Sequence, residues 1–97
     1  MALIMDEIIK TKKQFLEYLE IERGRALKTI DNYNRYLSSF VAFSKIKKPA
    51  EINDEIIRQF RLYLNRRGLK KKTQNYHLIA IRNFLKYLAR KGVKSLA

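Results

Sequence analysis

Two sets of polar residues recur in this 97-residue sequence at intervals of three, four and seven. An α-helix turns about 100° per residue, so each set would lie within an arc of about 60° on one helix face. We call Lys28, Asn32, Arg35 and Ser39 the first stripe, and Lys71, Asn75, Arg82 and Lys86 the second stripe. Arg and Lys pair with guanine, Asn with adenine, and the remaining cations and hydroxyls with phosphate. Each stripe therefore carries groups suited to the major groove of a duplex.

The charge of the chain is large and unevenly distributed. There are 22 basic and 9 acidic residues, for a net charge of +13. Residues 1–24 hold four basic and five acidic side chains, whereas residues 25–97 hold 18 and four. A surface of one sign repels itself unless it meets a polyanion. We therefore predict double-stranded DNA as the partner.

Three other partners are compatible with a basic surface. The main alternative is a non-enzymatic helical interaction module that binds an acidic protein or another polyanion. RNA recognition would call for an exposed aromatic platform, but most aromatic residues here have core spacing. A membrane-surface helix would need bulky apolar residues opposite its lysines, and the core requires those residues.

The run at residues 70–72 places lysines where a helix is expected to begin. Cations at a helix N-terminus oppose the macrodipole, so an anionic partner explains them better than folding stability does. Helix N-termini also bind phosphate, and a Lys-Thr pair opens both polar helices. The predicted DNA-binding residues are Lys28, Thr29, Asn32, Arg35, Lys70, Lys71, Lys72, Thr73, Asn75, Arg82 and Lys86.

Catalytic and cofactor chemistry find little support in the sequence. There is no Cys and only one His, which excludes disulfides and Cys-ligated metals. His77 shares a helix face with apolar residues and has no Ser, Cys or paired carboxylate to work with, so we expect it to pack, although a phosphate contact stays open. We expect no catalytic residue, no metal and no small-molecule cofactor. The longest apolar run is residues 1–5, so we expect no membrane segment and a cytoplasmic protein.

Apolar residues recur at helical spacing nearly throughout, which predicts an all-α fold. We expect helices over residues 6–23 and 27–44, a third from an N-cap at Asn53 to near Gly68, and a fourth over residues 71–91. One domain should span residues 1–97, with its core in residues 8–93. The predicted core-facing residues are Ile8, Phe15, Leu16, Leu19, Ile30, Tyr33, Leu37, Phe40, Val41, Ser44, Ile56, Ile57, Phe60, Leu64, Ile81, Phe84, Leu85 and Leu88.

The chain contains a weak internal repeat. Residues 15–33 and 60–76 each carry Phe-x-x-Tyr-Leu, then Arg-Gly, Lys-Thr and Asn-Tyr pairs, in the same order. This predicts two helical hairpins, produced either by duplication or by convergence on a common helical pattern.

Residues 15–24 (Phe-Leu-Glu-Tyr-Leu-Glu-Ile-Glu-Arg-Gly), followed by Lys28-Thr29, resemble the opening of a known domain. This is the N-terminal core-binding domain of tyrosine recombinases, the group that contains phage integrases and Xer-type enzymes. Residues 51–64 and 68–88 resemble its third and fourth helices. The resemblance covers residues 8–93, with the motifs in the right order and with the right gaps.

The resemblance implies a four-helix orthogonal bundle of two hairpins, a SAM-like fold that clamps duplex DNA mainly through its second and fourth helices. Thr29, Thr73, Asn75 and Arg82 match family positions, while the other predicted contacts rest on charge and spacing. The chain has Ala26-Leu27 where the family often has Ser-Pro, and Lys70 where it often has Ser.

The resemblance also implies what lies outside this sequence. Family members carry their Arg, Lys, His and nucleophilic Tyr in a separate catalytic domain, which is absent here. We expect a DNA-binding fragment that is not an enzyme alone. It would work with other recombinase protomers, in a tetramer on DNA, during site-specific recombination.

Overall fold

A computed structural model describes residues 6–93, and the apolar run at residues 1–5 lies outside them. The described part contains four α-helices and one short 3₁₀ turn, and no strand. They are α1 (Glu7–Ile21), α2 (Leu27–Ser44), η1 (Pro49–Glu51), α3 (Asp54–Arg66) and α4 (Lys71–Arg90). The all-α prediction is confirmed, and each helix begins and ends within two residues of its expected position.

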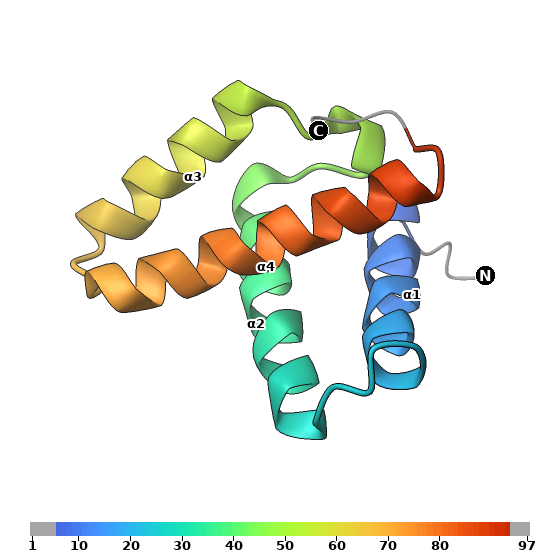
Figure 1. The fold of residues 1–97 in the computed structure, drawn as a ribbon. Helices are drawn as coiled ribbons and strands as arrows, with labels where there is room; N and C mark the ends of the chain where they lie inside the picture. The colour runs from blue at the N-terminus through green and yellow to red at the C-terminus, as the bar shows by residue number, and fades with distance from the viewer. Residues whose placement is uncertain (1–5, 94–97) are drawn as a thin grey trace, which may run out of the picture.

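The helices form two hairpins that cross each other (Figure 1). Helices α1 and α2 run side by side, and α4 lies across them, with α3 joined to the start of α4 by a short turn. Gly24 and Gly68 lie in the two hairpin turns with φ of +59° and +75°, a conformation that glycine adopts without steric cost. The crossing brings α2 and α4, which carry the two polar stripes, into direct contact.

Aromatic residues dominate the core where the helices cross. The ring centroid of Phe15 lies 5.3 Å from those of Phe84 and Tyr87, which joins α1 to α4. Phe40 of α2 meets Phe60 of α3 edge to face at 5.2 Å. Such pairs contribute about 0.5–1.5 kcal/mol beyond the area that they bury. The core is thus continuous through all four helices.

Most of the predicted core is buried, and the rest is half-buried. The buried members of the predicted set are Ile8, Phe15, Leu19, Leu37, Phe40, Phe60, Leu64, Ile81, Phe84, Leu85 and Leu88. The half-buried members are Leu16, Ile30, Tyr33, Val41, Ser44, Ile56 and Ile57. Besides His77, which the sequence also predicts to pack, the structure adds six further buried residues: Ile46, Pro49, Ile52, Gln74, Ala80 and Tyr87.

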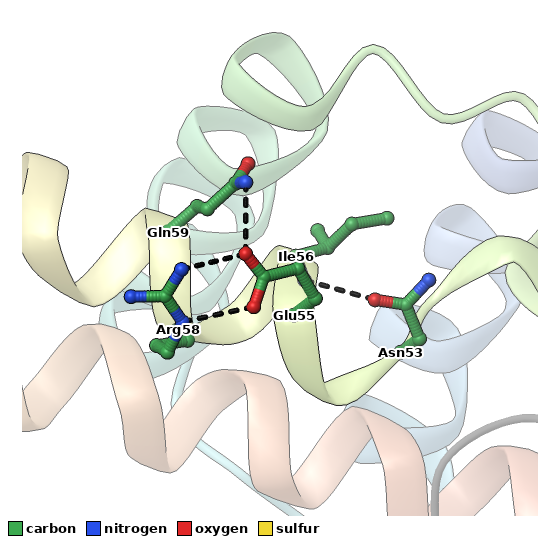
Figure 2. Close-up of polar contacts among 5 residues, drawn as sticks. All are labelled: Asn53, Glu55, Ile56, Arg58 and Gln59. Carbon is green, nitrogen blue, oxygen red and sulfur yellow. Dashed lines mark hydrogen bonds and ion pairs between the residues drawn. The ribbon is translucent and has the colours of Figure 1, made fainter.

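The start of α3 shows how local chemistry sets a helix end (Figure 2). The Asn53 side chain accepts a 2.9 Å hydrogen bond from the backbone N–H of Ile56, as its N-cap role predicts. Glu55 in the first turn then accepts hydrogen bonds from Arg58 and Gln59. By contrast, α2 and α4 begin after Ala26 and Lys70 without any side-chain cap.

Candidate nucleic-acid interface

The first stripe lies on the solvent side of α2. Its members Lys28 and Arg35 are exposed, while Asn32 and Ser39 are half-buried, as is Thr29 beside the stripe. The guanidinium of Arg35 donates a hydrogen bond to the side-chain oxygen of Asn32, one helical turn earlier. The stripe therefore presents two cations and an amide whose NH₂ group is available to a ligand.

The second stripe lies on the outward face of α4. Its members Lys71, Asn75, Arg82 and Lys86 are all exposed. Asn75, Arg82 and Lys86 also line a groove of about 680 Å³ between α3 and α4, which Arg61 of α3 completes. Arg61 was not predicted, because its position depends on how α3 packs against α4 rather than on the periodicity of α4.

The floor of this α3–α4 groove is apolar. It is formed by Ile57, Leu78, Ile81, Leu85 and Ala89. The cations at its edge thus lie beside apolar side chains, where electrostatic attraction is stronger than in bulk water. An apolar floor can also meet methyl groups, such as the C5-methyl of thymine in the major groove.

Two tyrosines connect Arg35 of the first stripe to Lys72, the neighbour of Lys71 in the first turn of α4, across the contact between α2 and α4. The rings of Tyr36 and Tyr76 stack with centroids 6.5 Å apart. The Arg35 guanidinium lies 6.0 Å from the Tyr36 ring centroid, and the Lys72 ammonium lies 5.9 Å from that of Tyr76. This row of cation, two rings and cation makes one surface of the two helices. Neither tyrosine was predicted in the site, because helix periodicity does not reveal contacts between helices.

The first turns of α2 and α4 present polar groups that no side chain caps. Lys70 occupies the N-cap position of α4, and Lys71 and Lys72 follow it, all three exposed. Neither first turn contains an acidic residue. The uncapped backbone N–H groups and the adjacent lysines are therefore both available to an anion.

Cations in the predicted site have no carboxylate partners. Within residues 6–93 the single ion pair joins Arg58 to Glu55, both outside the predicted set. All eleven predicted residues are exposed or half-buried, with Thr73 among the half-buried ones. A surface whose cations lack internal partners keeps its full attraction for an external polyanion.

His77 is buried in the structure, as a packing residue should be. Its ring centroid lies 4.6 Å from that of Tyr36 and 6.0 Å from that of Phe60. Nδ1 lies 2.9 Å from the backbone oxygen of Thr73, a hydrogen bond that requires the proton on Nδ1. His77 is 8% exposed, so it packs in the α2–α4 contact and is not accessible to a ligand.

The part of the chain that the structure describes contains neither a cluster of metal ligands nor a membrane-spanning helix. No group of three or more His, Asp or Glu side chains is placed to hold a metal ion between residues 6 and 93. Across the same stretch, none of the helices combines the length and the apolar character that crossing a membrane demands.

The chain is similar, over most of its own length, to proteins named tyrosine recombinase XerC. It is 30% identical over 79 residues to the tyrosine recombinase XerC of Bacillus pumilus, covering 78% of this chain and 26% of that protein. The chain is also similar to the XerC protein of Bacillus subtilis, at 28% identity over 89% of this chain and 29% of that protein. It is 31% identical to the XerC protein of Psychromonas ingrahamii, over 84% of this chain and 28% of that protein. The chain thus spans less than a third of these relatives.

No solved structure matches the chain at a significant level. A family comparison covers nearly its whole length, because residues 13–92 match the family described as "Phage integrase, N-terminal SAM-like domain". The matched residues include all four helices from the second turn of α1 onward. The chain therefore belongs to the family of phage integrase N-terminal SAM-like domains.

Proposed function

We propose that this domain binds duplex DNA through α2 and α4, as the N-terminal clamp of a site-specific tyrosine recombinase. The observation that carries the proposal is the Arg35–Tyr36–Tyr76–Lys72 row, which joins the first stripe on α2 to the basic first turn of α4. Arg and Lys residues of this surface neutralise phosphates, and the uncapped helix starts bind further phosphate oxygens.

Base recognition in this proposal belongs to the amide and guanidinium groups of the stripes. Arg82 and Asn75 project from α4 at the α3–α4 groove, and Asn32 projects from α2. A bidentate Arg–guanine or Asn–adenine pair discriminates against the wrong base by about 1–3 kcal/mol. The lysines at residues 70–72 then fix the register on the backbone without reading sequence.

Strand cleavage and exchange belong, in this proposal, to a separate catalytic domain, and this domain positions the duplex. Its protein partners are other recombinase protomers assembled on the same DNA. Family membership and the similarity to XerC proteins support this role.

A salt titration of binding tests the proposal directly. Fluorescence anisotropy would compare random duplex, single-stranded DNA and heparin. If five to eight phosphates are neutralised, the log–log slope for duplex is roughly −5 to −7. Duplex binding stronger than binding to the other two supports the clamp. Equal binding to all three, or a slope near zero, contradicts it.

A matched pair of variants separates the surface from overall charge. Arg35→Gln and Lys13→Gln each remove one exposed cation, but Lys13 lies on α1, away from both stripes. Arg35→Gln should weaken duplex binding and reduce the salt slope by roughly one, whereas Lys13→Gln should change neither. Equal effects would show that only total charge matters.

A second candidate function rests on the apolar floor of the α3–α4 groove. An acidic amphipathic peptide could lay its apolar side on Leu78 and its carboxylates against Arg61 and Arg82. Leu78→Ala should weaken such a peptide and leave duplex binding nearly unchanged. This candidate would be ruled out if Leu78→Ala lost duplex binding and the parent protein bound no such peptide.

A further inference from the structure

A second concave surface adjoins the α3–α4 groove, and Lys86 and Ala89 of α4 line both. It is a hollow of about 490 Å³ between α1, the turn that leads into α2, and α4. Its aromatic wall consists of Phe15, Tyr18, Tyr33 and Tyr87. These rings also pack on one another, with Tyr18 and Tyr87 centroids 5.1 Å apart.

Four cations from two parts of the chain line the same hollow. Arg23 and Arg25 come from the α1–α2 turn, and Lys86 and Arg90 come from α4. None of them forms an ion pair within residues 6–93, and no carboxylate is among the residues that line the hollow. Mutual repulsion makes such a convergence costly unless an anion enters it.

Two carboxylates, those of Glu17 and Glu22, lie near the aromatic wall and affect Tyr87. Burial chiefly, followed by Tyr18, Glu17 and Glu22, raises the pKa of the Tyr87 phenol. Glu17 and Glu22 are exposed and belong to the outer side of α1 and its end. They therefore moderate the charge around the hollow without lining it.

The polar groups inside the hollow are donors. Arg90 donates a 2.6 Å hydrogen bond to the phenol oxygen of Tyr18. Asn83 donates a 2.8 Å hydrogen bond to the phenol oxygen of Tyr33. Each phenol thus uses its oxygen as an acceptor, and among the described residues neither O–H group donates to the chain. Both O–H groups can therefore turn toward an incoming acceptor.

We infer that this hollow binds a single phosphoryl group. A phosphate offers several acceptor oxygens and a charge that three guanidinium groups, an ammonium and two phenols can share. Lys86 belongs to both the second stripe and the hollow, so the hollow continues the surface proposed to bind DNA. The phosphoryl group can come from the duplex backbone, a source that rests on the proposed function, or from free phosphate.

Titration of the 97-residue chain with inorganic phosphate at constant ionic strength tests the site itself. NMR would follow the Tyr18 and Tyr33 rings and the Arg Nε–H signals. We expect saturable shifts there. The affinity for phosphate should fall about tenfold or more in Arg25→Gln and stay unchanged in Lys13→Gln. The Arg25 backbone N–H bonds to Leu19, a contact that the substitution leaves intact. Absent shifts, or equal weakening in both variants, overturn the inference.

Tyr33→Phe provides a second variant that keeps every charge. It removes one O–H donor from the hollow and should weaken phosphate binding severalfold, while a retained circular dichroism spectrum shows that the chain is folded. Asn83→Ala breaks the same Asn83–Tyr33 hydrogen bond but keeps the phenol, so it controls for a shift of α4 against α2. Phosphate binding unaffected by this change and by Tyr18→Phe contradicts a role for the phenols.

Duplex titrations then identify the source of the phosphoryl group. If a backbone phosphate occupies the hollow, Arg25→Gln lowers the magnitude of the log–log salt slope by roughly 0.9. An unchanged slope with weakened phosphate binding assigns the hollow to free phosphate. Complete absence of duplex binding would refute the proposed function, yet the phosphate titration would still decide whether the hollow is a site.

Discussion

The side-chain amide of Asn83 donates a 2.8 Å hydrogen bond to the phenol oxygen of Tyr33, fifty residues earlier in the chain. The bond joins α4 to α2 beside the Phe15 ring, whose centroid lies 6.3 Å from that of Tyr33. It therefore helps to set the angle at which the two stripe-bearing helices cross. Their common surface depends on that angle, because α2 and α4 touch only where they cross.

A double-mutant cycle should measure this bond. We expect Tyr33→Phe and Asn83→Ala to show a coupling of about 0.5–1.5 kcal/mol in the free energy of unfolding, measured by urea denaturation. Tyr36→Phe is the matched control, because the Tyr36 ring also faces α4 but does not bond to Asn83. Coupling of equal size in the control cycle would mean that the hydrogen bond is not its source.

The core prediction concerns Phe84 of α4. Its side chain is 2% exposed and its ring packs on Phe15. Phe84→Ala should lower the free energy of unfolding by about 3–5 kcal/mol, because it removes apolar contacts and leaves a cavity. Ile79→Ala on the same helix, where the side chain is 44% exposed, should stay within about 0.5 kcal/mol. A loss at Ile79 as large as that at Phe84 would contradict the core assignment.

Arg82 allows base reading to be distinguished from phosphate contact. If Arg82 bonds guanine through both of its terminal nitrogens, Arg82→Ala should cost about 1–3 kcal/mol of binding to a preferred site and relax preference at one base pair. Arg82→Lys keeps the charge but loses the fork-shaped donor, so it should recover little of that preference. The measurement is competitive anisotropy with a site selected from random duplex.

A backbone-only role for Arg82 would give a different result. Affinity would then fall equally for all duplex sequences, and Arg82→Lys would restore most of it. Arg66→Ala is the control, since Arg66 is exposed on α3 and lies outside both stripes and the α3–α4 groove. It should leave sequence preference unchanged.

Sequence periodicity is sufficient to predict the helices here because the apolar positions repeat within each one. Phe60 and Leu64, four residues apart, are both fully buried on α3. Ile46 and Ile52 are equally buried but flank η1, where no period exists to identify them. Their burial follows from the path of the α2–α3 connection, which is a property of the folded chain.

In the candidate site, too, some features follow from helix periodicity and others only from the folded chain. The exposure of Lys28 and Arg82 follows from the angle of each residue on its own helix. The stacking of Tyr36 on Tyr76 and the contribution of Arg61 depend on helix crossing angles and on distances between helices. Single-helix geometry contains neither, so the sequence predicts the contacts on each helix but not the surface that joins them.

The last prediction concerns acid sensitivity of the connection before α3. The backbone N–H groups of Lys47 and Lys48 each donate a 2.8 Å hydrogen bond to the same carboxylate oxygen of Glu51. These bonds hold the pKa of Glu51 below its ordinary value of 4.5. Since the unfolded chain binds the proton more tightly, the stabilisation is fully present above pH 4.5 and is lost as the pH falls through the lowered pKa.

The difference in melting temperature between the Glu51→Gln variant and the parent protein should therefore shrink as the pH falls. The glutamine keeps one acceptor oxygen but cannot titrate, so its melting temperature should lie below that of the parent at neutral pH and approach it as the pH falls below 4.5. Glu20→Gln, an exposed change on α1, should give an offset that does not vary in this way. Melting curves measured from pH 7 to pH 3 test this expectation. A melting-temperature difference between Glu51→Gln and the parent that stayed constant would contradict it, because the charged carboxylate would then contribute nothing that a neutral amide lacks.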